Sequence, residues 1–162
     1  MKVKEISPDA VPRALELAER YRLLNEPEQA ESICHDVLAV DPENQIAIRT
    51  LLLAISDEYS RWRTLTVKHA QDVAARLTDP YERHYYTGVV IERYARAKMH
   101  ENQPSSMVVD WIDRAMEEFE QAEAIRPPNN DAAILRWNTC ARLLERLPKA
   151  APIEQAEIFD YA

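Results

Sequence analysis

The chain has 162 residues, a length that suits one domain able to bury a core without disulfides or metals. It holds one glycine, Gly88, against ten prolines, and it is rich in helix-favouring residues. This composition argues against a protein of strands and tight hairpins and predicts an all-α fold. The net charge of −8 argues against a general nucleic-acid binder, because phosphate contacts need a positive surface.

The charge is unevenly spread along the chain. Residues 1–58 carry six basic and twelve acidic side chains, residues 59–98 carry eight and four, and residues 99–162 carry six and twelve. The basic middle segment could accept an acidic peptide, or it could be an ordinary solvated helix face, which is the more common case.

Two further features concern the compartment. The N-terminus has no apolar core like that of a signal peptide, and the longest apolar run, residues 51–55, is too short to span a bilayer. We therefore expect a cytoplasmic protein without membrane insertion. Cys34 and Cys140 lie among apolar residues at helical spacing, so we interpret them as small buried hydrophobes rather than as a disulfide or a reactive thiol.

Apolar residues at helical spacing, interrupted by prolines, predict seven helices. Ser7 or Asp9 can cap the first, Ser60 the fourth, and Ser105 with Ser106 the sixth. The short link at residues 25–27 makes the first two helices antiparallel neighbours. The predicted ranges are 11–24, 28–40, 43–59, 60–78, 81–100, about 105–125 and 130–147.

Prolines close helical segments at Pro42, Pro80 and Pro127, which suggests an internal repeat with intervals of 38 and 47 residues. Residues 11–44 carry the clearest pattern, and two looser copies follow. The pattern resembles the tetratricopeptide repeat (TPR) family over residues 8–147. The matching residues are Leu17, Ala18, Tyr21, Ala30, Val37, Leu38 and Pro42 in the first copy, Ala75 and Pro80 in the second, and Gly88, Ala115, Phe119, Ala122 and Pro127 in the third.

The resemblance implies a single domain over residues 1–162, built as a right-handed α-α superhelix of about three TPR-like helical hairpins. Residues 130–147 would form a C-terminal capping helix, and residues 148–162 an acidic C-terminal tail. In the family, small residues such as Gly88 let the two helices of a pair approach closely. The rival architecture is a plain helical bundle.

The sequence offers little for catalysis. A single glycine excludes a nucleotide-binding glycine loop, and no histidine forms a zinc or di-iron motif. The glutamates of one helix, Glu117, Glu118, Glu120 and Glu123, suggest a solvated surface. We therefore expect no enzymatic activity, no cofactor and no metal. The four scattered histidines are His35, His69, His84 and His100.

The resemblance implies a protein–protein interaction scaffold that binds a peptide or protein segment, possibly acidic, in a concave groove. The first helix of each pair lines that groove in the family, which assigns to it Leu15, Glu19, Arg49, Leu53, Tyr85, Tyr86, Val89, Arg93, Asn138 and Arg142. The clamp for a carboxylate tail is absent, because the first groove helix offers Leu15 and Glu19.

Three alternatives stay open. The tyrosines Tyr81, Tyr85, Tyr86 and Tyr94 either form a binding hot spot or fill gaps between helices. The chain could be a self-assembling structural module, a homo-oligomer joined through the array ends or through the tail residues Ile153, Ala156, Ile158, Phe159 and Tyr161. It also resembles the small acidic three-repeat chaperones of bacterial secretion in size and charge.

Overall fold

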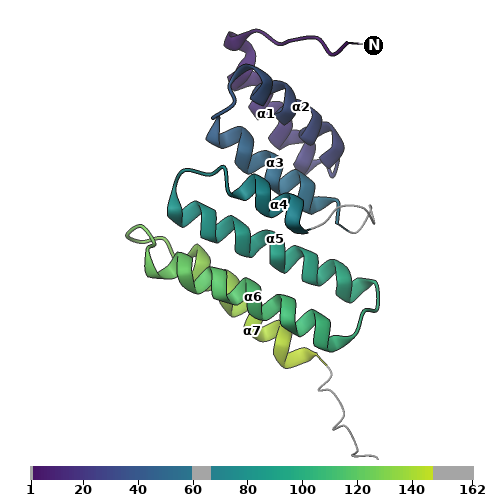
Figure 1. The fold of residues 1–162 in the computed structure, drawn as a ribbon, viewed down its shortest axis with the longest axis vertical. Helices are drawn as coiled ribbons and strands as arrows, with labels where there is room; N and C mark the ends of the chain where they lie inside the picture. The colour runs from purple at the N-terminus through teal and green to yellow at the C-terminus, as the bar shows by residue number, and fades with distance from the viewer. Residues whose placement is uncertain (1, 60–66, 148–162) are drawn as a thin grey trace, which may run out of the picture.

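The computed structural model describes residues 2–59 and 67–147, and every regular element in these residues is helical (Figure 1). This confirms the all-α prediction for the described part of the chain. None of its helices is both long and apolar enough to cross a membrane. The elements are a 3₁₀ turn, Pro8–Ala10, followed by α1 Val11–Leu23, α2 Pro27–Val40, α3 Gln45–Asp57, α4 Val67–Ala74, α5 Pro80–His100, α6 Ser105–Ala124 and α7 Ala132–Arg146.

The predicted helices agree with the observed ones within a few residues, except at the fourth. There α4 ends at Ala74, earlier than expected. The expected start of that helix at Ser60 lies outside the described residues, as does the predicted acidic tail, residues 148–162. Pro80 begins α5, with Asp79 as its cap, so it starts the next helix rather than only ending the previous one.

The helices pack in chain order. Each contacts the next, and the odd-numbered helices also contact one another as α1 with α3, α3 with α5 and α5 with α7. Figure 1 shows the consequence, with α1 and α2 at one end of the molecule and α6 and α7 at the other.

Two clusters of buried residues form the interior, and α5 contributes to both. The N-terminal core joins α1 to α4 with Val90 and Ala97 of α5. The C-terminal core joins α5, α6 and α7 with Val67 of α4. Because α5 lies between the two cores, it is apolar on two sides and shows no single apolar stripe.

Gly88 is a point of close approach between α5 and α6. A Cβ atom placed at Gly88 would lie 2.6 Å from Cε1 of Phe119, whose side chain is fully buried. The prediction that Gly88 marks a close approach of two helices is therefore confirmed.

Asparagine takes the place of glycine in turns between helices. Asn25, Asn102 and Asn129 have φ of 63°, 55° and 63°, the left-handed region in which asparagine is the most favourable side chain after glycine. The turns after α1 and α5 share one geometry. The N–H of Glu26 donates to Tyr21 O at 2.9 Å, and that of Gln103 to Lys98 O at 3.1 Å.

The predicted caps of the first and sixth helices are wrong. Ser7 precedes only the 3₁₀ turn and makes no capping hydrogen bond, and α1 starts after Ala10, so Asp9 does not cap it either. Ser105 is the first residue of α6, preceded by Pro104, and no side chain caps that helix. Two helices of the described residues have side-chain caps: Asn44 accepts from Ala47 N–H at 2.9 Å, and Asp79 accepts from Tyr81 N–H at 2.8 Å.

Candidate functional site

The odd-numbered helices contact one another in the order α1, α3, α5 and α7, and we call their accessible side chains together the odd-helix face. Each of the ten predicted groove residues lies on α1, α3, α5 or α7. Glu19 and Arg142 are exposed, whereas Val89 is 1 % exposed and belongs to the C-terminal core. Val89 therefore does not line a surface, because the two-sided burial of α5 turns it inward. The other seven are half-buried: Leu15, Arg49, Leu53, Tyr85, Tyr86, Arg93 and Asn138.

One carboxylate joins three of these helices. Nη1 of Arg93 on α5 donates to Asp57 Oδ1 at 2.6 Å, and Nε of Arg22 on α1 donates to Asp57 Oδ2 at 2.9 Å. Arg93 also donates to Ser56 Oγ at 2.7 Å. Burial lowers the pKa of Arg93, while Asp57 opposes that shift by favouring the charged form. Arg93 is thus occupied by the protein itself.

Arg49 is occupied in the same way. Its Nη1 lies 2.6 Å from Glu82 Oε1, which joins α3 to α5. Both side chains are about three-quarters buried, so the pair has little contact with water. Burial also raises the pKa of the neighbouring Tyr86, whose hydroxyl therefore stays protonated.

Glu92 is a buried carboxylate that sequence reasoning did not single out. It is 1 % exposed and accepts from Arg96 Nε at 2.9 Å and from Arg136 Nη1 at 3.2 Å, which joins α5 to α7. Burial of Arg136 disfavours its charge, but Glu92 and a hydrogen bond with Tyr85 outweigh that effect and raise its pKa. In the sequence, a glutamate between core positions with an arginine four residues later could have indicated this buried ion pair.

The tyrosines mainly fill space between helices. Tyr81 is buried and stacks on Tyr85, with ring centroids 5.8 Å apart, and Tyr85 meets the edge of Tyr86 at 5.1 Å. Tyr94 lies between Tyr59 and Trp111. Tyr85 and Tyr86 are only half-buried, so parts of both rings stay accessible on the odd-helix face.

The basic segment 59–98 uses its charges internally. Each of its basic side chains within the described residues bonds to the chain itself, through a carboxylate or a backbone carbonyl. These side chains are Lys68, Arg76, Arg83, Arg93, Arg96 and Lys98. The segment therefore fits the interpretation as ordinary helix surface better than that of an open basic site for an acidic peptide.

A shallow hollow of about 260 Å³ lies at the C-terminal ends of α3 and α5. Ser56, Arg93 and His100 are among the residues that line it. Both residues of the Arg93–Asp57 pair line it, so it is a polar recess on the odd-helix face.

The described residues contain no arrangement suited to metal chemistry or to a reactive thiol. Residues 2–59 and 67–147 hold no group of three or more His, Cys, Asp or Glu that could bind a metal ion. Cys34 and Cys140 are free and buried, as predicted, and burial raises the pKa of each thiol to about 12. Neither thiol is therefore a nucleophile near neutral pH.

The sequence suggested that the glutamates of α6 form a solvated surface, but two of them contact neighbouring helices. Glu118 Oε2 lies 2.8 Å from His84 Nδ1 of α5, and Glu120 accepts from Trp137 Nε1 of α7 at 3.0 Å. Both residues join α6 to its neighbours, because a helix packed between two others has polar positions along each seam.

Comparison with protein-family models, with curated proteins and with solved structures gives no match for this chain. Functional inference therefore depends on its own residues and helices.

Proposed function

We propose that this chain is a non-enzymatic TPR-like scaffold that binds a peptide or protein segment on its odd-helix face. In this proposal α1–α2, α3–α4 and α5–α6 are three helical hairpins of a right-handed superhelix. The helix α7 caps the array, and the protein acts in the cytoplasm without a cofactor, a metal or nucleic acid.

The observation that supports the proposal most is the contact of alternate helices, α1 with α3, α3 with α5 and α5 with α7. Stacked hairpins produce this order, because the first helix of each pair packs on the first helix of the next. The ion pairs follow the same order, since Asp57 joins α1, α3 and α5 while Glu92 joins α5 and α7.

The repeat residues add support. Ala18, Ala30 and Val37 of the first copy are fully buried, as are Ala115, Phe119 and Ala122 of the third. These are the positions at which the family packs one helix of a pair against the other. Arg142 of α7 is exposed, and α7 contacts only α5 and α6 among the helices with clear contacts, which suits a helix that ends an array.

The chemistry of the face indicates what it would bind. Arg49 and Arg93 are paired internally, so a ligand gains little from them. Tyr85 and Tyr86 offer aromatic contact at the centre, and Glu19 and Arg142 offer opposite charges at the two ends. A segment with apolar side chains in its middle and charges at its ends fits this arrangement.

The proposal is tested by selecting peptides from a random phage-displayed library with the full chain. Selected peptides are then measured against Glu19→Arg and Arg142→Glu, two exposed positions at opposite ends of the face. We expect at least one substitution to weaken each peptide about tenfold, a loss of about 1.4 kcal/mol. Arg49 and Tyr85 are poor positions for this test, because both are built into the packing.

Matched controls carry the same charge changes away from the face. Glu117→Arg lies on α6 and Lys68→Glu on α4, and both residues are exposed. Selected peptides should bind these variants as they bind the unchanged protein. A library that yields no binders, or binders that respond to the controls and not to the odd-helix variants, contradicts the proposal.

A further inference from the structure

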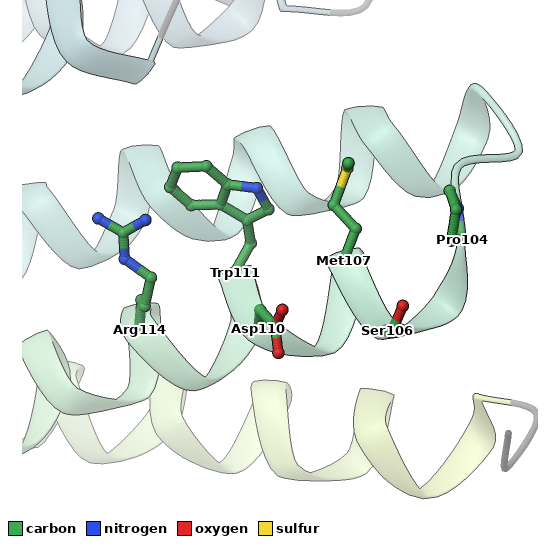
Figure 2. Close-up of a pocket in the computed structure, with 6 residues that line it drawn as sticks. All are labelled: Pro104, Ser106, Met107, Asp110, Trp111 and Arg114. Atoms are coloured by element: carbon green, nitrogen blue, oxygen red, sulfur yellow. The ribbon is translucent and has the colours of Figure 1, made fainter.

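A second surface lies on the even-numbered helix α6 and includes none of the ten predicted groove residues. Met107, Trp111 and Arg114 follow one another at spacings of four and three residues, and Figure 2 shows all three side chains on one side of α6, directed towards α5. Together with Pro104, Ser106 and Asp110 they line a hollow of about 380 Å³. With Tyr94 of α5, whose ring lies 5.0 Å from that of Trp111, they form what we call the Trp111 surface.

The Trp111 surface has an apolar floor and one available cation. Met107 is 40 % exposed, although methionine usually lies inside a core. The Arg114 guanidinium lies 4.3 Å from the centre of the Trp111 ring, and Arg114 makes no ion pair with a carboxylate of the described residues. A stacked guanidinium keeps its N–H edge free for a carboxylate. Lys98, by contrast, is paired with Glu101.

The chain supplies a segment that matches this surface. Residues 148–162 follow α7, and α7 packs along α6 and ends beside its Pro104 end (Figure 2). These 15 residues can span up to about 50 Å, whereas α6 from Ser105 to Arg114 covers only about 14 Å. After Lys149 the segment has no basic residue and combines apolar and acidic side chains, Ile153, Glu154, Glu157, Ile158, Phe159, Asp160 and Tyr161.

We propose that residues 148–162 dock on the Trp111 surface of their own chain. Ile158 and Phe159 cover Met107 and Trp111, and an acidic side chain beside them pairs with Arg114. A short tether holds the segment at an effective concentration of about 1 mM, so a contact with a Kd of about 0.25 mM is occupied about four-fifths of the time.

Oxidation of Met107 tests the proposal on the full chain. The protein is treated with dilute hydrogen peroxide, and sulfoxide formation at each methionine is followed by mass spectrometry. At millimolar effective concentration, removing the contact by Ile158→Ser with Phe159→Ser should speed the oxidation of Met107 about fivefold. Met116, half-buried against the C-terminal core on the same helix, is the internal control and should oxidise at an unchanged rate.

A charge exchange tests the ion pair. Arg114→Glu should speed the oxidation of Met107, and so should replacement of Glu154, Glu157 and Asp160 together by lysine. The two changes combined should restore protection, because opposite charges again meet. Protection of Met107 should also be independent of protein concentration.

Three results would overturn the proposal. Met107 could oxidise at the same rate with and without Ile158 and Phe159, or the charge exchange could fail to restore protection. Protection that disappears on dilution would assign the docked segment to a second copy of the chain. None of these results bears on the odd-helix face, which the peptide selection tests separately.

Discussion

Gly88 shows how one residue sets the distance between two helices. Its missing side chain leaves room for the ring of Phe119, and a Cβ there would lie 2.6 Å from the ring. Overpacking of this kind costs about 1–3 kcal/mol, and alanine regains about 1 kcal/mol of helix propensity. We therefore expect Gly88→Ala to lower the free energy of unfolding by about 1 kcal/mol, measured by urea unfolding followed by circular dichroism.

The sign of this effect should depend on Phe119. In a Phe119→Leu background the branched chain can move away from the new methyl group, so Gly88→Ala should become neutral or stabilising. If Gly88→Ala raises the stability of the unchanged protein, the close approach of α5 and α6 is wrong.

At this scale the sequence was informative about residue size. It marked Gly88 as a residue of close helix approach, and the ring of Phe119 lies against it. The left-handed residues Asn25, Asn102 and Asn129 were not predicted, because an asparagine in a polar link suits many turns. The sequence did contain one signal for two of these turns: an asparagine is followed two residues later by a proline at Asn25 and Pro27, and again at Asn102 and Pro104.

Glu92 links helix α5 to helix α7 through an ion pair. Its carboxylate is 1 % exposed between Arg96 and Arg136, so removing its charge leaves two guanidinium groups facing a neutral amide. Breaking a buried ion pair costs about 3–5 kcal/mol. Glu92→Gln should therefore destabilise the protein by about 3 kcal/mol in chemical unfolding, and amide hydrogen exchange should rise most in α7.

Glu101→Gln is the control for this substitution. Glu101 forms an ion pair with Lys98 at the more exposed end of α5, and such pairs contribute less than about 1 kcal/mol. If Glu92→Gln and Glu101→Gln have equal small effects, Glu92 does not hold α7 on α5.

The helices themselves were predictable, because apolar spacing and proline act within a few residues along the chain. The ion pairs between helices could not be predicted from the sequence. Asp57 lies 35 residues from Arg22 and 36 from Arg93, and Glu92 lies 44 from Arg136. Many other pairs of opposite charge are equally possible until the packing order is known.

For the whole molecule, the prediction of the candidate face depended on the order of the helices. Nine of the ten predicted residues keep exposed or half-buried side chains on α1, α3, α5 and α7, and only Val89 is buried. Val89 was misplaced because α5 faces two cores, so its sequence pattern does not mark which side is accessible. The internal pairing of Arg49 and Arg93 also needed the three-dimensional structure.

The most direct test of the array is the distance between its first and last helices. Glu19→Cys on α1 and Arg142→Cys on α7 accept spin labels, whereas Cys34 and Cys140 are buried with thiol pKa values near 12 and stay unlabelled. Three helix-to-helix steps of 8–10 Å separate α1 from α7, so pulsed electron–electron double resonance should give a distance of about 25–30 Å. A distance near 10 Å would place α1 beside α7 in a closed bundle and contradict the array.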